Sequence, residues 1–396
     1  MFSPVRQIIA VARINIRSIP KRPGLSATVL LASAIVVAVL LAFLAMAQGF
    51  QRTVAGAGRD DVAVVMKPGS QSEINSVITR DQVRMLQRVP MAANTPDGRP
   101  LVSPEVFVIV DGHKKTTGQP VNVPLRGLTA IAPLVRANWK LVEGRMLAPG
   151  RDELVVGRAI AETVEGLEVG RTVRFGTHDW KIVGLFETGG SVYESEIWGD
   201  LSTVQSRFNR GGSVQVVRIA LEAPERLADL QRLLDSDPNL KLKATSERDY
   251  LADLAEGTVL LIRWIGWPTA IIMAIGALAG ALNTMYASVA ARTREIGTLR
   301  AIGFSGPATF FGTMAESLLL AAAGGLLGSL GAFTLFEGRS GSTLGGSFTQ
   351  IVFDFHLDAS AIATGVMLAI VIGLLGGFFP ALRAARVPIT AAFRGR

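Results

Sequence analysis

The sequence predicts an α-helical membrane protein with four transmembrane helices and an α+β extracytoplasmic domain inserted between the first and second of them. Each of four uncharged stretches can supply the roughly 20 residues that a helix needs to cross a bilayer core of about 30 Å. A long polar segment, residues 52–258, separates the first stretch from the other three. The uncharged stretches are Pro23–Gln51, Trp264–Ala291, Ser317–Phe336 and Ala359–Leu382.

The distribution of charge predicts the orientation of these helices. Residues 1–22, 291–308 and 383–396 contain five, three and four basic residues and one acidic residue, which is a net charge of +11. Because the whole chain carries +8, the remainder carries −3. Basic segments next to transmembrane helices stay in the cytoplasm, so we expect both termini there. The excess of positive charge therefore reflects membrane topology, and we expect no binding to nucleic acid.

This topology divides the chain into nine segments. They are a cytoplasmic head (1–22), transmembrane helix 1 (23–51), an extracytoplasmic domain (52–258), helix 2 (259–290), a cytoplasmic loop (291–308), helix 3 (309–336), an outer loop (337–358), helix 4 (359–382) and a cytoplasmic tail (383–396).

The cytoplasmic head has the pattern of a basic amphipathic helix that ends at Pro20. Its arginines, Arg6, Arg13 and Arg17, recur on one face, which suits a helix that lies in the headgroup layer. The apolar residues on its other side are Val5, Ile8, Ile9, Ala12, Ile16 and Ile19. The uncharged run that follows is longer than the apolar core of a signal peptide, so we expect a retained anchor.

The extracytoplasmic domain alternates strand and helix patterns. We expect two α+β lobes, one split by the insertion of the other, and a barrel-like or sandwich subdomain where turn residues are dense, between Gly144 and Gly189. Another helix begins near Ser246 and continues into transmembrane helix 2. The predicted strands are Asp61–Met66, Val106–Val110, Glu153–Val156, Thr172–Phe175 and Trp180–Phe186, and the predicted helices are Arg80–Val89 and Glu225–Leu234.

Small and charged residues within the spans suggest how the helices pack. Each of the last three spans contains two glycines four residues apart, a spacing that lets helices approach closely. These pairs are Gly276/Gly280, Gly324/Gly328 and Gly373/Gly377. Glu316 is the only carboxylate within a span, and we expect it to face protein because a charge in lipid is costly.

The residues offer no catalytic, cofactor or metal site, and we expect a protein that is not an enzyme. The chain has no cysteine, which removes disulfides, thiolate chemistry and Cys-based metal sites. Its three histidines, His113, His178 and His356, are isolated. The sequence has no G-x-x-x-x-G-K-[ST] motif, so it has no P-loop for ATP.

The most specific stretch is ARTREIGTLRAIGFS, residues 291–305, in the second cytoplasmic segment. It resembles the "REIG-LRA-G" signature of the FtsX-like, MacB-type ABC transporter permeases. The resemblance continues through ESLLL (316–320) with GGLLG (324–328), GGFFPALRAAR (376–386) and the closing residues 388–394. Residues 143–145, 153–157, 169–173 and 183–186 are similar to the family's periplasmic core domain. On this resemblance residues 52–258 are a MacB-like core domain and residues 259–396 an FtsX-like permease domain.

The resemblance implies a permease subunit of an ABC-type exporter in the bacterial inner membrane. Residues 292–303 would form a coupling helix on a separate ATPase subunit that binds ATP, and ATP hydrolysis would move the periplasmic domain. The implied partners are that ATPase, a second permease copy or paralogue, a periplasmic adaptor and membrane lipids. The implied ATPase contacts are Arg292, Arg294, Glu295, Ile296, Leu299 and Arg300.

An alternative from another functional class is an FtsX-like signalling scaffold that regulates a periplasmic cell-wall hydrolase without transport. The large size of the extracytoplasmic domain favours the exporter. The substrate and the choice between a homodimer and a heterodimer stay open at this point.

Overall fold

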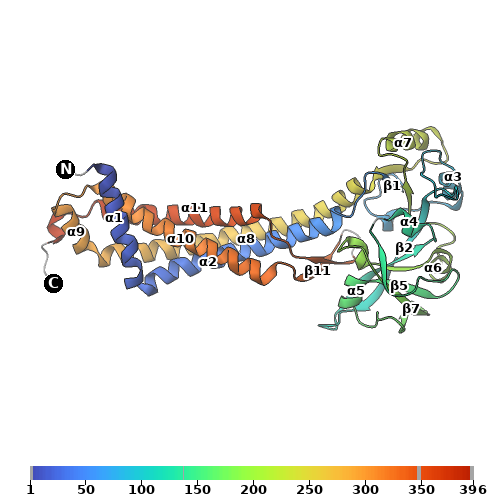
Figure 1. The fold of residues 1–396 in the computed structure, drawn as a ribbon, viewed down its shortest axis with the longest axis horizontal. Helices are drawn as coiled ribbons and strands as arrows, with labels where there is room; N and C mark the ends of the chain where they lie inside the picture. Colours follow the sequence, from blue (N-terminus) through green and yellow to red (C-terminus); the bar gives the residue numbers. More distant parts are fainter. Residues whose placement is uncertain (1–2, 137, 346–348, 393–396) are drawn as a thin grey trace. The chain divides into compact units, whose positions relative to one another are not determined.

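The computed structural model describes residues 3–136, 138–345 and 349–392. The chain forms two compact units, each visible in Figure 1. The helical unit contains Met1–Met46, Ile262–Arg339 and His356–Arg396, and the sheet domain contains Ala47–Leu261 and Ser340–Phe355. The tail residues Arg394 and Arg396 lie outside the described residues.

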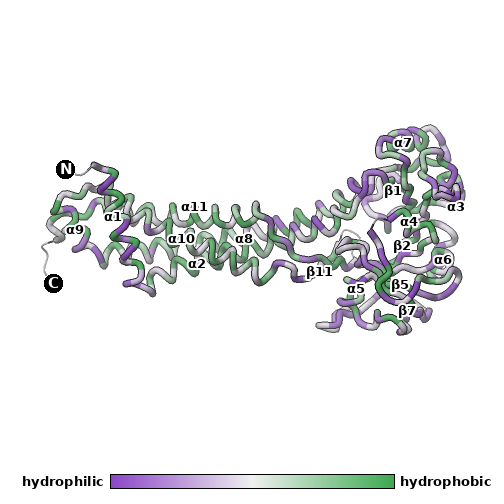
Figure 2. Tube along the Cα trace, viewed as in Figure 1, coloured by the Kyte–Doolittle hydropathy of each residue, from purple (hydrophilic) through white to green (hydrophobic). Residues whose placement is uncertain are grey.

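Four helices in the described chain are long and apolar enough to cross a membrane. They are α2 (Pro23–Ala55), α8 (Glu247–Ala291), α10 (Gly306–Phe336) and α11 (Ala359–Ala385). Figure 2 shows hydrophobic residues along these helices within the helical unit. Side chains cap two of them: Ser305 Oγ accepts from the Ala308 N–H, and Asp358 Oδ1 accepts from the Ala361 N–H at 2.8 Å.

Two short helices complete the helical unit. They are α1 (Pro4–Ser18), which lies against α10, and α9 (Thr293–Ala301), which follows α8 directly (Figure 1). The 3₁₀ turns η1 (Ile19–Lys21) and η4 (Ile389–Ala392) lie at the two ends of the unit's chain.

Glycines allow close contact between the spanning helices, as their spacing predicts. A Cβ on Gly324 would lie 2.5 Å from the Leu30 carbonyl oxygen of α2, and one on Gly373 would lie 2.6 Å from the Ala321 Cβ of α10. Gly328 and Gly377 lie at equally close approaches. The pair on α8 differs, because a Cβ on Gly276 or Gly280 would meet no described atom within 4 Å beyond its own stretch of helix. That face of α8 is open.

The sheet domain is built on one path of strands that two lobes share. The strand order is β10-β1-β9-β2-β3-β8-β5-β7-β4, and β6 also pairs with β7. The strands are β1 (Val62–Met66), β2 (Val102–His113), β3 (Pro120–Leu128), β4 (Lys140–Gly144), β5 (Glu153–Gly157), β6 (Thr172–Phe175), β7 (His178–Glu187), β8 (Ile197–Asp200), β9 (Val216–Ala220) and β10 (Lys243–Ser246). The path has β10 and β4 as its ends, so these strands do not close into the barrel that the turn spacing suggested.

The long strand β2 joins the two lobes. Its first part, Val102–Glu105, pairs with β9, and its second part, Val106–His113, pairs with β3. The first lobe contains β1, β9 and β10, and the second, formed by the residues between β2 and β8, is inserted into it. This strand order is the one that an insertion of one lobe into the other would give.

Short helices and turns cover the sheet. They are η2 (Glu73–Asn75), α3 (Arg80–Leu86), α4 (Ala132–Val135), α5 (Arg158–Thr163), η3 (Val192–Ser195), α6 (Leu201–Arg207) and α7 (Arg226–Ser236). The predicted helices at 80–89 and 225–234 correspond to α3 and α7, and α8 confirms the predicted helix that starts near Ser246.

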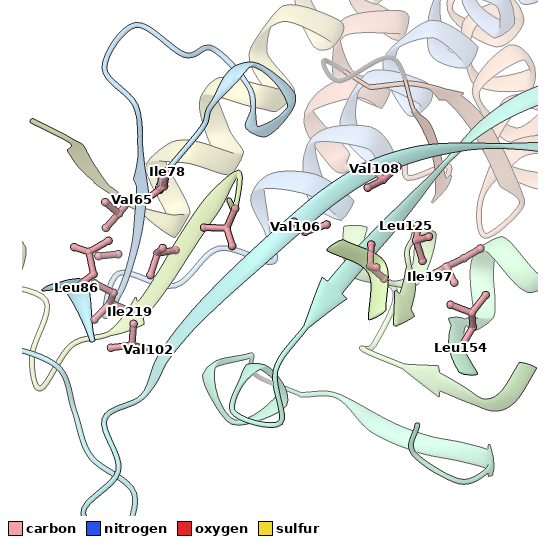
Figure 3. Packing of buried hydrophobic residues seen from close by; sticks show 14 of the residues in the cluster. Val65, Ile78, Leu86, Val102, Val106, Val108, Leu125, Leu154, Ile197 and Ile219 are labelled. Carbon is pink, nitrogen blue, oxygen red and sulfur yellow. The ribbon is translucent and has the colours of Figure 1, made fainter. Parts of the chain in front are cut away.

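The hydrophobic core runs through both lobes along β2. Figure 3 shows Val102 of β2 beside Ile219, with Val65 farther away in the same lobe, and Val108 of the same strand near Leu125 in the second lobe. All five side chains are buried. Because β-branched residues dominate these strands, both faces of the sheet can pack closely without long flexible side chains.

The outer loop forms a β-hairpin, which the sequence analysis did not foresee. Strands β11 (Ser340–Leu344) and β12 (Gln350–Asp354) pair antiparallel. The Val352 N–H donates to Ser195 Oγ at 3.0 Å, and Lys114 Nζ donates to Ser342 Oγ at 3.2 Å. These contacts make the hairpin part of the sheet domain.

Candidate functional site

The predicted coupling segment is a short helix with one face packed on its own chain. Helix α9 begins after Arg292 and ends before Gly303, whose φ of +104° favours glycine and turns the chain toward α10. Ile296 is buried against Val289, Ala384 and Val387. The helix is therefore held against the end of α11.

Hydrogen bonds fix the same contact. Arg300 Nη1 donates to the carbonyl oxygens of Ala385, at 2.6 Å, and Val387, at 3.1 Å. Leu299 is half-buried on the same side. Of the six predicted ATPase contacts, Ile296 thus belongs to the interior of this chain, and Arg300 is committed to α11.

Arg292 is also buried, at the junction of three helices. Its Nη1 lies 3.1 Å from Glu316 Oε2 in α10, its Nη2 donates to Asn15 Oδ1 in α1, and its Nε lies 3.2 Å from Glu295 Oε2. Glu316 is only 5% exposed, as expected of a carboxylate that faces protein. The contacts of Arg292 with Glu316 and Asn15 could not be read from the sequence, because both residues are far from Arg292 along the chain.

The other side of α9 is exposed. We call it the outer face of α9 and define it as Arg294, Glu295, Thr298, Ala301 and Ile302. Ile302 is 68% exposed. An exposed apolar side chain on a surface that also carries Arg294 and Glu295 is the composition of a surface that can bind another protein.

A second cluster of charges lies inside the sheet domain. Glu105 Oε2 lies 2.7 Å from Arg136 Nη2, 3.0 Å from Arg126 Nη1 and 2.5 Å from Arg218 Nη1. We call this cluster the buried charge network; its members are Glu73, Glu105, Arg126, Arg136, Glu196, Arg218 and Glu247. The network was not predicted from the sequence. Glu105 and Arg218, which lie beside or within apolar strand runs, could have indicated it.

Electrostatics keep Glu105 ionised. Burial alone would raise the pKa of Glu105, but Arg136, Arg218 and Arg126 outweigh it and hold that pKa well below its usual value. Burial and the neighbouring Glu247 carboxylate raise the pKa of Tyr193, so its hydroxyl stays protonated and donates to Glu247. The network is therefore a set of buried ion pairs, in which only the Nε of Arg136 is left without a hydrogen-bond partner among the described residues.

The network lines a small cavity and anchors the start of α8. The cavity, ≈ 40 Å³, is bordered by Arg126, Arg218 and the buried Gln350, whose amide nitrogen has no hydrogen-bond partner among the described residues. It can hold water, because one molecule needs roughly 10–15 Å³. Glu247, in the first turn of α8, accepts from Arg218 Nε at 3.2 Å.

Metal chemistry finds no support among the described residues, where no group of His, Asp and Glu is arranged to hold an ion. The Nδ1 of His356, for example, lies 3.0 Å from one carboxylate, that of Glu337.

Comparisons with known proteins agree with this anatomy. Residues 26–236 match the family model of the MacB-like periplasmic core domain, and residues 269–389 match that of the FtsX-like permease C-terminal region. The macrolide export ATP-binding/permease protein MacB of Hahella chejuensis is 27% identical over 57% of this chain and 35% of that protein. The protein of the same name from Campylobacter jejuni is 25% identical over 75% of this chain.

The chain matches less than half of the length of these relatives, 35% and 49% respectively. Among solved structures, the periplasmic region of MacB from Actinobacillus actinomycetemcomitans aligns with 53% of this chain and 97% of that one, at 14% identity and a TM-score of 0.37. Four apolar helices and these relatives describe a multi-pass inner-membrane protein. With the periplasmic-core model matching more than half of its residues, the chain belongs to the FtsX/MacB-type family of ABC transporter permeases.

Proposed function

We propose that this chain is the permease subunit of an ABC-type exporter that couples ATP hydrolysis by a separate cytoplasmic ATPase to movement of its periplasmic sheet domain. One observation carries most of the proposal: α8 is a single helix from Glu247, in the buried charge network, to Ala291, directly before α9. A continuous helix transmits a displacement along its axis better than a flexible linker does. The relatives' names, which specify export, favour transport over a signalling scaffold.

The ATPase would bind the outer face of α9. Of the expected apolar contacts, Ile296 is buried in the protein and Leu299 is half-buried. Ala301 and Ile302 are exposed, on the surface that also carries Arg294 and Glu295. Burying an exposed isoleucine in a partner contributes about 1.5–3 kcal/mol. Force applied there would pass through Arg292, which lies between α8 and α9 and forms an ion pair with Glu316 of α10.

A second permease copy would pack on the open face of α8. Gly276, Ala279, Gly280 and Asn283 follow one another on this helix, and a Cβ on either glycine meets nothing within 4 Å. Asn283 is exposed and has no hydrogen bond to any described residue. An amide about eight residues, or about 12 Å, from the end of a spanning helix would be costly in lipid and would be satisfied by a neighbouring helix.

The outer face of α9 is tested by Ala301→Asp with Ile302→Asp. We expect loss of co-purification with the ATPase and of ATPase stimulation, because two carboxylates would be buried at the interface. The matched control, Val77→Asp with Leu134→Asp, places the same charges on exposed apolar residues of the sheet domain. Membrane levels of both variants should equal those of the wild type. If the α9 variant still binds and stimulates the ATPase fully, this docking surface is wrong.

A further inference from the structure

Helix α1 uses only one of its faces to pack on the rest of the chain. Val11 lies against Gly312 of α10, where a Cβ on the glycine would be 2.5 Å from Val11 Cγ1. Asn15 accepts from Arg292, and Gln7 Oε1 accepts from the Ser305 N–H at 3.0 Å. This packed face fixes α1 across one end of the helical unit (Figure 1).

An apolar row on α1 is left uncovered. Val5, Ile9 and Ile16 are 63%, 60% and 36% exposed. Their spacing of four and seven residues places them on one side of the helix. The remaining members of the apolar face expected from the sequence, Ile8, Ala12 and Ile19, are partly buried by the protein. An exposed apolar row of this kind is unfavourable in water.

A row of arginines runs beside it. Arg6, Arg13 and Arg17 are exposed, and none of them has an acidic partner among the described residues. Residues 3–22 contain no acid. The side chains of Arg6, Ile9, Ala10, Arg13, Ile14 and Arg17 line an open depression of ≈ 410 Å³. Three unpaired guanidinium groups around one depression are complementary to an anion with several oxygens.

We propose that this surface of α1 binds anionic phospholipid of the cytoplasmic leaflet. The arginines bind phosphate oxygens of the headgroups, while Val5, Ile9 and Ile16 enter the boundary between headgroups and acyl chains. The adjacent apolar row selects a lipid over a soluble phosphate, since only a lipid satisfies both rows. The proposal rests on the proposed function only in placing α1 on the cytoplasmic side of the bilayer.

The same helix links lipid to the coupling region. Through Asn15 it contacts Arg292 at the start of α9, and through Gln7 it contacts Ser305 in the turn after α9. Lipid bound to α1 thus holds both ends of the coupling helix in place.

The proposal is tested by native mass spectrometry of the full-length chain in detergent, without the ATPase. The chain is titrated with phosphatidylglycerol or with phosphatidylcholine of the same acyl chains. Since a basic residue near an anionic surface contributes roughly a fivefold change in affinity, R6Q/R13Q/R17Q should weaken phosphatidylglycerol binding on the order of 100-fold. Phosphatidylcholine binding should change little. Both results are independent of whether the chain is an exporter.

Two control variants separate charge from folding. R6K/R13K/R17K keeps the charge and should retain most of the preference for phosphatidylglycerol. R80Q/R88Q/R99Q removes three exposed arginines of the sheet domain and should bind like the wild type. The proposal is overturned if R6Q/R13Q/R17Q retains wild-type affinity for phosphatidylglycerol. It is also overturned if glycerol 3-phosphate, which has no acyl chains, competes as well as the lipid.

Discussion

At the scale of single residues, the charges of this protein fall into two groups with opposite roles. Glu105, Arg136 and Arg218 are buried and form ion pairs within the sheet domain, where they fix how β2, β9 and the residue after α4 meet. Arg6, Arg13 and Arg17 are exposed and unpaired, and so remain available to a ligand outside the chain. The difference lies in desolvation. A buried charge is tolerated only when partners replace its water, whereas an exposed charge stays hydrated and needs no partner within the chain.

Replacing Glu105 with glutamine should destabilise the sheet domain by about 3–5 kcal/mol at neutral pH, because three buried arginines lose their common partner. The folded pKa of Glu105 is depressed from its ordinary value of 4.5, so the stability that its charge contributes is present above pH 4.5 and is lost as the pH falls below it. The gap between wild type and variant should therefore be largest at neutral pH and narrow in acid.

Thermal unfolding of both proteins in nanodiscs, followed between pH 7 and the acid limit of the lipid, measures that gap. Glu143→Gln, which removes an exposed carboxylate of the same domain, serves as control and should not change the unfolding temperature. Equal unfolding temperatures for Glu105→Gln and the wild type at neutral pH would show that the network does not stabilise the fold.

At the scale of secondary-structure elements, sequence patterns predicted what depends on local spacing. Hydropathy predicted the four long helices, and glycines four residues apart predicted the contacts at Gly324 and Gly373. The patterns did not predict which side of α9 faces the protein, because that depends on Val387 and Ala384, nearly one hundred positions away in the chain. The buried charge network escaped for the same reason: its members come from seven separate elements or loops of the fold.

The two sides of α9 should respond differently to mutation. Ile296→Asp places a carboxylate in the cluster with Val289 and Ala384, and the cost of burying an unpaired charge should lower stability and membrane abundance by itself. Thr298→Asp on the exposed side should leave abundance unchanged. Quantitative blotting of membranes and thermal unfolding in detergent distinguish the two variants. Comparable abundance of both would place Ile296 at a surface.

At the scale of the whole molecule, the proposed function depends on the side of the membrane on which the basic segments of the helical unit lie. The helical unit has its basic segments, 1–22, 291–308 and 383–396, on the side that the charge rule assigns to the cytoplasm. In the proposed orientation α9 would be accessible to an ATPase and α1 to the cytoplasmic leaflet, and the sheet domain would lie in the periplasm. Coupling and lipid binding therefore depend on one orientation.

Single cysteines provide the test, since the chain contains none. Gln119→Cys in the sheet domain should react with a membrane-impermeant thiol reagent in intact cells, and Ala301→Cys on the outer face of α9 should react only after the membrane is permeabilised. Position 119 avoids Gly118, whose φ of +67° would strain a cysteine. Position 301 avoids Ser305, whose side chain caps α10. Labelling of residue 301 but not of residue 119 in intact cells would invert the topology, and the ATPase could then not reach α9.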